Sequence, residues 1–408
     1  MKPVLTMILL ALAAAPLRAE PLPPAVDLRT VLQFARDASA PVAIERTGVD
    51  AAVAELASAT ALPNPTLSYN RQRQPGRLTN FDSDRAQDWT LEQPLLLGGQ
   101  RSARRKAADR AIDAASARVA LSQHTLALEV AEAYVDLLLA QERVALLQRG
   151  LDDLVRLRGI VEGRRASGLA SDYELARVEV EEASWRVRLA DAESALVEEQ
   201  GALAQALGVP DWHPTALGAL QPFALRPVGD LANHPGLVAA QSEADLARAQ
   251  VEVARRERMP AVSVNVNRFW TSRPYGGTTG IGFAVEVPLF DRRNGALDKA
   301  RAEAASASLQ RELTQTRVST AIDSQARVVE QRTRALDAYR RSAGARLPQL
   351  RQMAEDAYRF GRTPVSELLD ATRSGAELAI AQAELVAGLM EAQLKLEAAR
   401  GELLHRAE

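Results

Sequence analysis

Two carboxylates near the C-terminus, Glu367 and Asp370, have the spacing that most directly suggests chemistry. Side chains three residues apart share one face of a helix. The pair follows a helix break expected at Gly361, and Pro364 suits the first turn of the next helix because its missing N–H costs nothing there. Carboxylates crowded into a constriction favour cations and repel anions. The pair would attract cations if it lined a constriction, and the alternative is an ordinary solvated helix face.

A third acidic residue, Asp172, holds the matching place in the first half of the chain, after another expected helix break at Gly168. The segments GLASDYELA (168–176) and GRTPVSELL (361–369) align with each other. The two breaks are therefore interpreted as copies of one structural feature.

Other residue types that carry chemistry are absent or scattered. The chain has no Cys, and none of its histidines has another three or four residues away, so no dedicated transition-metal site is predicted: His124, His213, His234 and His405. The motifs GxSxG, HExxH, GxGxxG and the Walker loop do not occur, so neither an enzyme nor a cofactor is expected. A net charge of -2 over 408 residues lacks the basic footprint that nucleic acid requires.

The N-terminus has the character of a secretory signal peptide. Lys2 precedes an apolar core from Val4 to Ala15, and Ala19 offers a small residue before a cut. Roughly twelve apolar residues are too few to span a bilayer as a helix. Residues 1–19 are therefore expected to be removed on export, which places the mature chain in the periplasm or the outer membrane.

The mature chain reads as two copies of one unit. The segment 39–70 resembles 233–267, and strand-to-helix corners follow at Pro94 and Pro288. The copies are about 195 residues apart, far longer than a solenoid repeat. Each copy predicts a helix, two strands, a long helix, a break and a final helix. The expected division is 20–207 for the first repeat, 208–232 for a linker, 233–404 for the second repeat and 405–408 for a tail.

The helices carry a coiled-coil pattern. Apolar residues recur in strict 4-3-4-3 spacing at Leu126, Val130, Ala133, Leu137, Ala140, Val144, Leu147, Leu151 and Leu154. The helical stretch between Gly98 and Gly168 would form a rod of about 100 Å at 1.5 Å per residue. The chain is therefore expected to be mainly α, with long antiparallel coiled-coil helices.

Four short runs alternate apolar and polar residues as strands do: about 64–72, 87–96, 260–270 and 279–290. The runs are either two amphipathic hairpins over a soluble core or lipid-facing strands with aromatic residues near the interfaces. Four strands cannot close a membrane barrel, since the smallest have about eight. Three copies would supply twelve.

These features resemble the TolC-like outer-membrane efflux proteins, over essentially the whole mature chain. The resemblance is carried by the duplication and by the phrases LPNP (62–65), QPLLLGGQR (93–101) and YRFGRTPVSELLDAT (358–372). The phrase VPLFDRRNG (287–295) is most similar to the heavy-metal, Czc-type branch. The family implies a homotrimer with a twelve-stranded β-barrel in the outer membrane and a helical tunnel reaching into the periplasm.

The resemblance also assigns roles to residues. Each protomer would cross from barrel to tunnel at two corners, where a proline ends strand pairing and flexible residues absorb the turn: Pro94, Gly98 and Gly99, and Pro288, Asn294 and Gly295. The linker 208–232 and the tail would form a small mixed domain at the tunnel's waist.

At the tunnel's periplasmic entrance, the family pattern places Glu367 and Asp370 in stacked rings of carboxylates. Asp172 would tie to a basic residue across the helix break and hold the entrance shut. Thr363 stands where the family has that basic residue, so the adjacent Arg362 is the candidate partner.

The function implied is a passive exit duct in the outer membrane. Its partners would be a periplasmic membrane-fusion adaptor, an inner-membrane RND transporter and outer-membrane lipid, and its cargo heavy-metal cations. Two alternatives stay open. The same duct could carry drugs, small organic molecules or a type I secreted polypeptide, or the chain could be a periplasmic coiled-coil adaptor or structural protein without a barrel.

Overall fold

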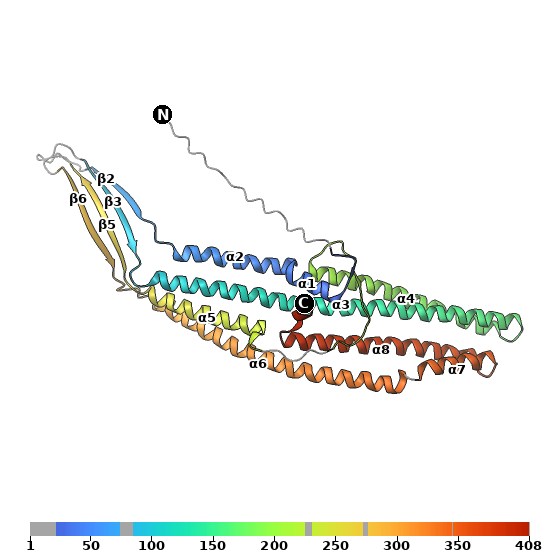
Figure 1. Ribbon diagram of the computed structural model, residues 1–408. Coiled ribbons are helices and arrows are strands. Elements are labelled where there is room, and N and C mark those ends of the chain that lie inside the picture. Colours follow the sequence, from blue (N-terminus) through green and yellow to red (C-terminus); the bar gives the residue numbers. More distant parts are fainter. Residues whose placement is uncertain (1–21, 74–84, 225–230, 272–275, 345, 408) are drawn as a thin grey trace, which may run out of the picture.

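The computed structural model is an elongated molecule with a sheet at one end and the turns of two helical hairpins at the other (Figure 1). It describes residues 22–73, 85–224, 231–271, 276–344 and 346–407. The predicted signal peptide, residues 1–19, lies outside the described residues.

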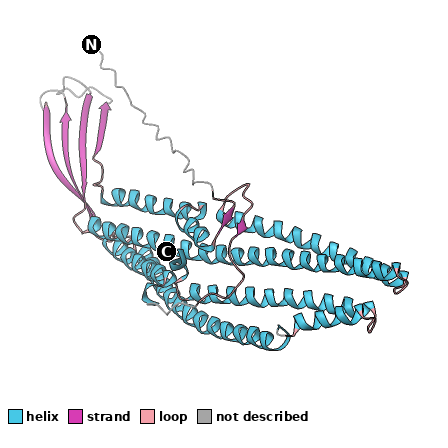
Figure 2. Cartoon of the chain, turned by 45° about the vertical axis from the view of Figure 1, so that its right-hand side comes forward, coloured by secondary structure: helices cyan, strands magenta, loops and turns pink. Residues whose placement is uncertain are grey.

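Helices make up most of the molecule (Figure 2). The first half contains α1 (Leu28–Asp37), α2 (Ala40–Thr60), α3 (Gln100–Ala166) and α4 (Asp172–Leu207). The second half contains α5 (Pro235–Arg256), α6 (Asn294–Tyr339), α7 (Leu347–Arg359) and α8 (Val365–Ala399). A short helix, Leu231–Asn233, precedes α5, and another, Leu403–Ala407, follows α8. Among the described residues, no helix combines the length and the apolar character needed to cross a membrane.

The helix α3 sets the length of the molecule. Its 67 residues correspond to about 100 Å, and it packs against α2, α4, α5 and α8. Most positions of the predicted 4-3-4-3 seam are buried in these contacts, among them Leu126, Val130, Leu137 and Leu154. The 4-3-4-3 spacing therefore correctly identified most of the residues of α3 that pack against neighbouring helices.

Where the first half has one long helix, α3, the second half has two shorter ones, α6 and α7. A π-helical turn, Arg340–Gly344, follows α6, and α7 starts at Leu347 with a proline in its first turn. Proline cannot continue a helix without losing a hydrogen bond, so the restart lies where the sequence places Pro348.

Four antiparallel strands form one sheet in the order β2-β3-β5-β6. Their bounds are β2 (Thr66–Arg73), β3 (Arg85–Leu95), β5 (Ala261–Trp270) and β6 (Gly277–Glu286). β6 ends before Pro288 and is shorter than the run predicted to reach residue 290. Each outer edge, on β2 and on β6, has no strand partner among the described residues.

A small two-stranded sheet lies near the middle of the elongated molecule, in a region we call the waist (Figure 2). β1 (Ala25–Val26) pairs in parallel with β4 (Thr215–Ala216), and the indole of Trp212 donates to the carbonyl of Pro23 over 3.1 Å. β4 comes from the predicted linker, and the C-terminal helix Leu403–Ala407 packs on α1. The contribution of the N-terminal strand and of α1 to the waist was not predicted.

The core has two parts along the rod. One surrounds the waist and joins α1, α3, α4, α6 and α8. It contains a fully buried carboxylate, Glu397, which is paired with the guanidinium of Arg406 (Oε1–Nη2 2.6 Å). The other fills the hairpin half with Trp185, Tyr358, Val365 and Leu368 among others. The hairpins are therefore packed as a pair up to their turns.

Candidate functional site: the sheet faces and the hairpin tip

The register of the sheet places large apolar residues of all four strands on one face, although Phe269 falls on the other. Leu67 lies opposite Leu91, Leu91 opposite Val266, and Val266 opposite Ile281. The same face carries Tyr69, Trp89, Val262, Val264, Phe283 and Val285. We call it the outward face. Ile281 is 80% exposed and Phe283 79% exposed, which is an uncommon amount of open apolar surface.

The opposite side, the polar face, carries Ser, Thr, Asn, Gly and acidic residues. Asn267 and Asn265 lie directly across from Gly280 and Gly282. A Cβ on Gly280 would come within 2.3 Å of the Asn267 side-chain oxygen, so the asparagines lie over strand β6 where it has no side chains. The hydroxyl of Ser263 donates to Glu92 over 2.6 Å. Alternation thus separates a lipid-compatible surface from a hydrated one.

Charge is also separated by face. The carboxylates of the sheet, Asp88, Glu92 and Glu286, all fall on the polar face. The described residues of that face include no Lys or Arg. A passage lined by this face would therefore favour cations.

The first corner between sheet and helix contradicts one detail of the prediction. Pro94 does not end strand pairing, because it lies inside β3 opposite Ser263, and pairing with β5 continues to Leu95. Pairing with β2 stops at Glu92, so the proline falls where β3 has only one neighbour, as edge prolines do. Gly99 takes the left-handed conformation (φ 77°) that starts α3.

Close packing explains the other glycine of this corner. A Cβ on Gly98 would lie 2.8 Å from the Cβ of Met259. The corner is therefore packed tightly against Met259, and a larger residue at position 98 would displace that side chain.

The second corner turns at a residue that the sequence did not single out. Arg293 has φ 52° and precedes the first helical residue, Asn294, while Gly295 already lies in the first turn of α6. A left-handed arginine is uncommon, and its backbone N–H donates to the Asp291 carboxylate over 2.8 Å. Asn294 and Gly295 therefore do not absorb the turn as predicted. Pro288 lies in the corner itself, two residues beyond β6.

At the far end, Gly168 and Gly361 terminate α3 and α7 in the same way. Gly168 (φ 73°) and Gly361 (φ 67°) are left-handed. The N–H groups that follow them, of Leu169 and Arg362, return to the carbonyls of Arg164 and Ala357 over 2.8 Å each. This is the Schellman arrangement that satisfies the last carbonyls of a helix. Pro364 is the N-cap of α8, one position before the first helical residue.

The predicted gate residues lie on the surface of the hairpin tip. Glu367 and Asp370 are exposed on α8, on the side away from the buried Val365 and Leu368. The Asp370 carboxylate pairs with Arg373 over 3.1 Å. The two acidic residues are thus available to face a neighbour or a passage.

The single chain does not form the predicted ion pair between Asp172 and Arg362. Asp172 pairs with Arg165 over 2.6 Å, within its own hairpin. The guanidinium of Arg362 lies over the ring of Phe360 at 5.6 Å. Arg164 joins the two hairpins at their turns instead.

Arg164 connects the two turns directly. Its guanidinium donates to the carbonyl of Arg359 over 2.9 Å and to that of Leu169 over 3.3 Å, and it lies 5.0 Å from the ring of buried Tyr358. A basic residue in the last turn of a helix commonly serves the last carbonyls. Leu169 lies beyond the end of α3, so that rule does not explain its bond, and no sequence signal places Arg164 against the Arg359 carbonyl of the other hairpin.

The structure also brings together two histidines that the sequence leaves scattered. The rings of His124 on α3 and His234 at the start of α5 are 5.5 Å apart, edge to face, and both side chains are buried. Burial, aided by the neighbouring His234, lowers the pKa of His124 to about 4, although the Ala398 carbonyl acts the other way. The pair is therefore neutral at ordinary pH.

A half-buried acidic residue on α3, Asp136, lies among other charged side chains of α3, α4 and α8. Burial and the carboxylates of Glu391, Glu199 and Glu132 raise the pKa of Asp136 to about 6, with Lys395 opposing them. In the described part of the chain, no set of three or more His, Cys, Asp or Glu side chains could hold a metal ion.

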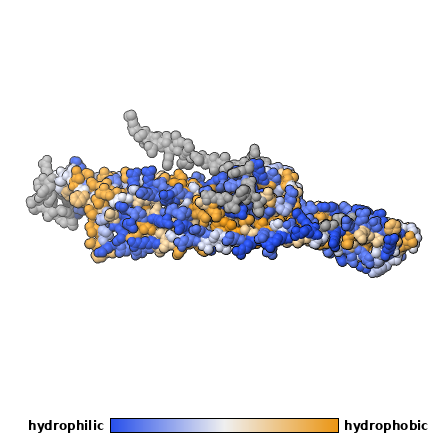
Figure 3. Space-filling view, turned by 60° about the horizontal axis from the view of Figure 1, so that its bottom comes forward, coloured by the Kyte–Doolittle hydropathy of each residue, from blue (hydrophilic) through white to orange (hydrophobic). Residues whose placement is uncertain are grey.

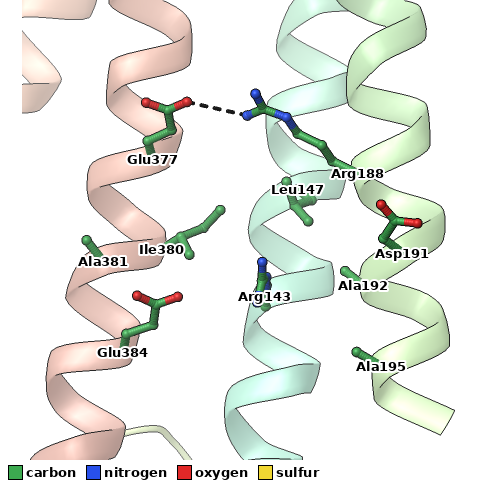
Figure 4. Close-up of a pocket in the computed structure, with 10 residues that line it drawn as sticks. All are labelled: Arg143, Leu147, Arg188, Asp191, Ala192, Ala195, Glu377, Ile380, Ala381 and Glu384. Carbon is green, nitrogen blue, oxygen red and sulfur yellow. Dashed lines mark hydrogen bonds and ion pairs between the residues drawn. The ribbon is translucent and has the colours of Figure 1, made fainter. Parts of the chain in front are cut away.

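A groove of about 530 Å³ runs between α8 and the α3–α4 hairpin. Its floor is small and apolar, with Leu147, Ala192 and Ile380, and the Arg188–Glu377 ion pair (3.4 Å) spans it (Figure 4). On the face shown in Figure 3, apolar residues gather where the sheet meets the helices and hydrophilic ones dominate much of the hairpin half. Nothing in the lining of the groove resembles a catalytic set.

Comparison with known proteins agrees with this geometry. The family described as "Outer membrane efflux protein" matches residues 32–209 and 230–402. The cobalt-zinc-cadmium resistance protein CzcC of Cupriavidus metallidurans is 29% identical over 286 residues, which cover 65% of this chain and 67% of that protein. The nickel-cobalt-cadmium resistance protein NccC of Alcaligenes xylosoxydans xylosoxydans is 28% identical over 316 residues, 75% and 71% of the two chains. The crystal structure of CusC superimposes with a TM-score of 0.76 at 19% identity and covers 92% of each chain.

Proposed function

Because the chain belongs to the outer membrane efflux protein family, we propose that it is the exit duct of a tripartite efflux system. The protein is located in the outer membrane and extends into the periplasm. The proposed duct is passive: an inner-membrane RND transporter supplies the driving force, and a periplasmic adaptor joins the two. Residues 1–19 would be the export signal that brings the chain to the periplasm.

The sheet is the observation that carries this proposal. It has an outward face whose apolar residues run across all four strands, a polar face, and two edges without a strand partner among the described residues. An unpaired edge exposes backbone N–H and C=O groups that can bond to another strand. Lipid cannot satisfy these groups, so an open sheet edge does not occur inside a membrane. Three copies joined edge to edge, β6 of one to β2 of the next, would close a twelve-stranded barrel with the polar face inside. The matched halves of the chain would then give each protomer two crossings from barrel to tunnel.

Heavy-metal cations are the proposed cargo. The named relatives CzcC and NccC are resistance proteins for cobalt, zinc, cadmium and nickel. The acidic polar face and the exposed pair Glu367 and Asp370 would favour cations along the path. In the proposed trimer, Glu367 and Asp370 form rings at the periplasmic entrance, and Arg164 holds the two hairpins of each protomer together while the entrance is shut.

The test is a metal-sensitivity profile of a strain that lacks the gene, covering cobalt, zinc, cadmium, nickel, copper and silver. Loss of resistance to one or more metals, restored by the full-length gene, is the expected result. Unchanged metal tolerance together with sensitivity to drugs would transfer the cargo assignment to small organic molecules and leave the duct in place.

A further inference from the structure

Two helices lie at opposite edges of the part of the rod that is nearest the sheet. There α2 packs on α3, α3 on α5, and α5 on α6, so α2 and α6 are the outer members of one row of helices (Figure 1). The helix α2 leads into the edge strand β2, and the edge strand β6 leads into α6. Each side of the molecule therefore combines an edge strand with an edge helix.

Both edge helices carry a stripe of exposed small and apolar residues at spacings of three or four. On α2 the stripe begins with Ile44, which is 69% exposed, and on α6 it includes Leu309, which is 66% exposed. Such spacing is the pattern by which one helix packs along another. We call these surfaces the α2 stripe (Ile44, Thr47, Ala51, Ala54 and Ser58) and the α6 stripe (Ala302, Ala305, Leu309 and Leu313).

The two stripes lie at the same height along the rod. Near the sheet, hydrogen bonds and an ion pair join the end of α2, the start of α3, the end of α5 and the start of α6, through Thr60, Arg101, Arg104, Glu257 and Arg293. Thr60 and Arg293 therefore mark a common height. Ile44 lies about 24 Å from Thr60 along α2, and Leu309 lies about 24 Å from Arg293 along α6. Rotation about an axis along the rod preserves height, so it would bring Ile44 of one copy beside Leu309 of another.

The charged residues that flank the two stripes are of opposite sign at matching heights. Asp50 flanks the α2 stripe and Arg301 flanks the α6 stripe, about 15 Å and about 12 Å from the common height. On the other flanks, Glu55 and Lys299 lie at about 8 Å and about 9 Å. Because α2 runs towards the sheet and α6 away from it, each acidic residue would meet its basic one on the same side of an antiparallel contact.

The two basic residues have only weak partners within their own helix. Arg301 pairs with Asp298 over 3.1 Å, and Lys299 pairs with Glu303 over 3.6 Å. All four side chains are exposed, and ion pairs of this kind contribute little to stability. Arg301 and Lys299 can therefore also bind a carboxylate of another copy.

We propose that the α2 stripe of one copy packs antiparallel against the α6 stripe of the next, with the ion pairs Asp50–Arg301 and Glu55–Lys299 setting the register. This inference rests on the proposed function, because β6 of one copy must pair with β2 of the next in the closed barrel. That pairing brings α6 beside the α2 of the next copy. The helix contact therefore continues the strand contact, and the flanking charges select a second copy of this chain as the occupant of the stripe.

Disulfide cross-linking tests the contact, because the chain has no Cys of its own. Ala51 and Ala302 lie on the two stripes, each about 14 Å from the common height. Outer membranes that contain the full-length variant Ala51→Cys, Ala302→Cys are treated with a mild oxidant. We expect a covalent trimer on a denaturing gel without reductant. Co-expression of the two single-Cys variants should give covalent pairs of chains.

The matched control combines Val53→Cys with Ala302→Cys. Val53 is also exposed and lies at nearly the same height as Ala51, but it is about 200° around α2 from it. This variant should give at least tenfold less cross-linked product.

Charge exchange tests the register in the Cys-free protein. Asp50→Arg alone and Arg301→Asp alone should each speed dissociation of the detergent-solubilised trimer at least fivefold, measured by size-exclusion chromatography at raised temperature. The two substitutions together should restore the wild-type rate to within twofold. Glu129→Arg, at an exposed position on α3, should leave the rate unchanged. Failure of the exchange to restore the rate would overturn the assigned ion pair.

The remaining outcomes separate this inference from the proposed function. Absence of the Ala51–Ala302 cross-link in protein that light scattering shows to be a trimer would overturn the inference alone. Cross-linking of Ala51→Cys to a different protein, with none to Ala302→Cys, would assign the α2 stripe to that partner and overturn the inference as well. Recovery of the wild type as a detergent-free monomer would overturn the proposed function and the inference together.

Discussion

Acidification should weaken the folded rod through His124, and the size of the effect follows from its environment. The imidazole is buried against His234, and its pKa is lowered to about 4 from the ordinary value of 6.5. A folded-state pKa below the unfolded value means that the unfolded chain binds the proton more readily. The stabilisation is therefore complete above pH 6.5 and is lost as the pH falls towards 4.

The magnitude is of the order of 2.5 kcal/mol between pH 7.5 and pH 4.5, from about 1.4 kcal/mol per pKa unit. Many carboxylates titrate in the same range, so the wild type alone is not informative. The variant His124→Gln keeps a side chain that can donate to the Ala398 carbonyl but cannot be protonated. Its pH dependence should be flatter than that of the wild type by this amount.

The assay is denaturant unfolding of the detergent-solubilised protein, followed by helical circular dichroism at both pH values. At pH 7.5 the variant should be the less stable of the two, and at pH 4.5 the difference should shrink or reverse. Parallel loss of stability in wild type and variant would refute the reasoning, because His124 would then carry no unusual proton equilibrium.

Three further outcomes follow from the tip, the gate and the waist. Gly361→Ala should lower the free energy of unfolding by about 1–2 kcal/mol, because an L-residue is strained at φ 67°. Gly48→Ala on α2, which has open space around it, should raise that free energy slightly. The midpoints of denaturant unfolding compare the two variants. Glu367→Gln with Asp370→Asn should lower the cation-to-anion permeability ratio in planar bilayers, and an unchanged ratio would remove both from the gate. Arg406→Met should lower the free energy of unfolding by about 3–5 kcal/mol, because it leaves the fully buried carboxylate of Glu397 without its counter-ion. A change below about 1 kcal/mol would contradict the stabilising role of this ion pair.

The elements that depend on local periodicity were predictable. The 4-3-4-3 spacing selected the buried side of α3, and the alternating runs lie where the four strands form. Gly168 and Gly361 were recognised because only glycine takes the left-handed position after a helix at little cost. These signals lie within a few residues of one another, so one sequence is enough to read them.

The details that depend on distant segments were not predictable. Pro94 stays in a strand because β5, about 170 residues away in sequence, continues beside it. The turn at the second corner falls on Arg293, because the Asp291 carboxylate accepts a hydrogen bond from the backbone N–H of Arg293. Arg164 and the His124–His234 pair act across helices whose neighbours are fixed only by the tertiary fold. The predicted Asp172–Arg362 ion pair does not form within the chain, where Asp172 pairs with Arg165 and the Arg362 guanidinium lies over the Phe360 ring.

The most direct test of the account is the oligomeric state and fractionation of the mature protein. Membranes are separated by density, the outer-membrane fraction is extracted with detergent, and the protein mass is determined by light scattering with the detergent contribution removed. The account predicts a trimer found in the outer membrane and soluble only with detergent. A monomer recovered from the periplasm without detergent would contradict it, because a single four-stranded sheet with two open edges encloses no passage.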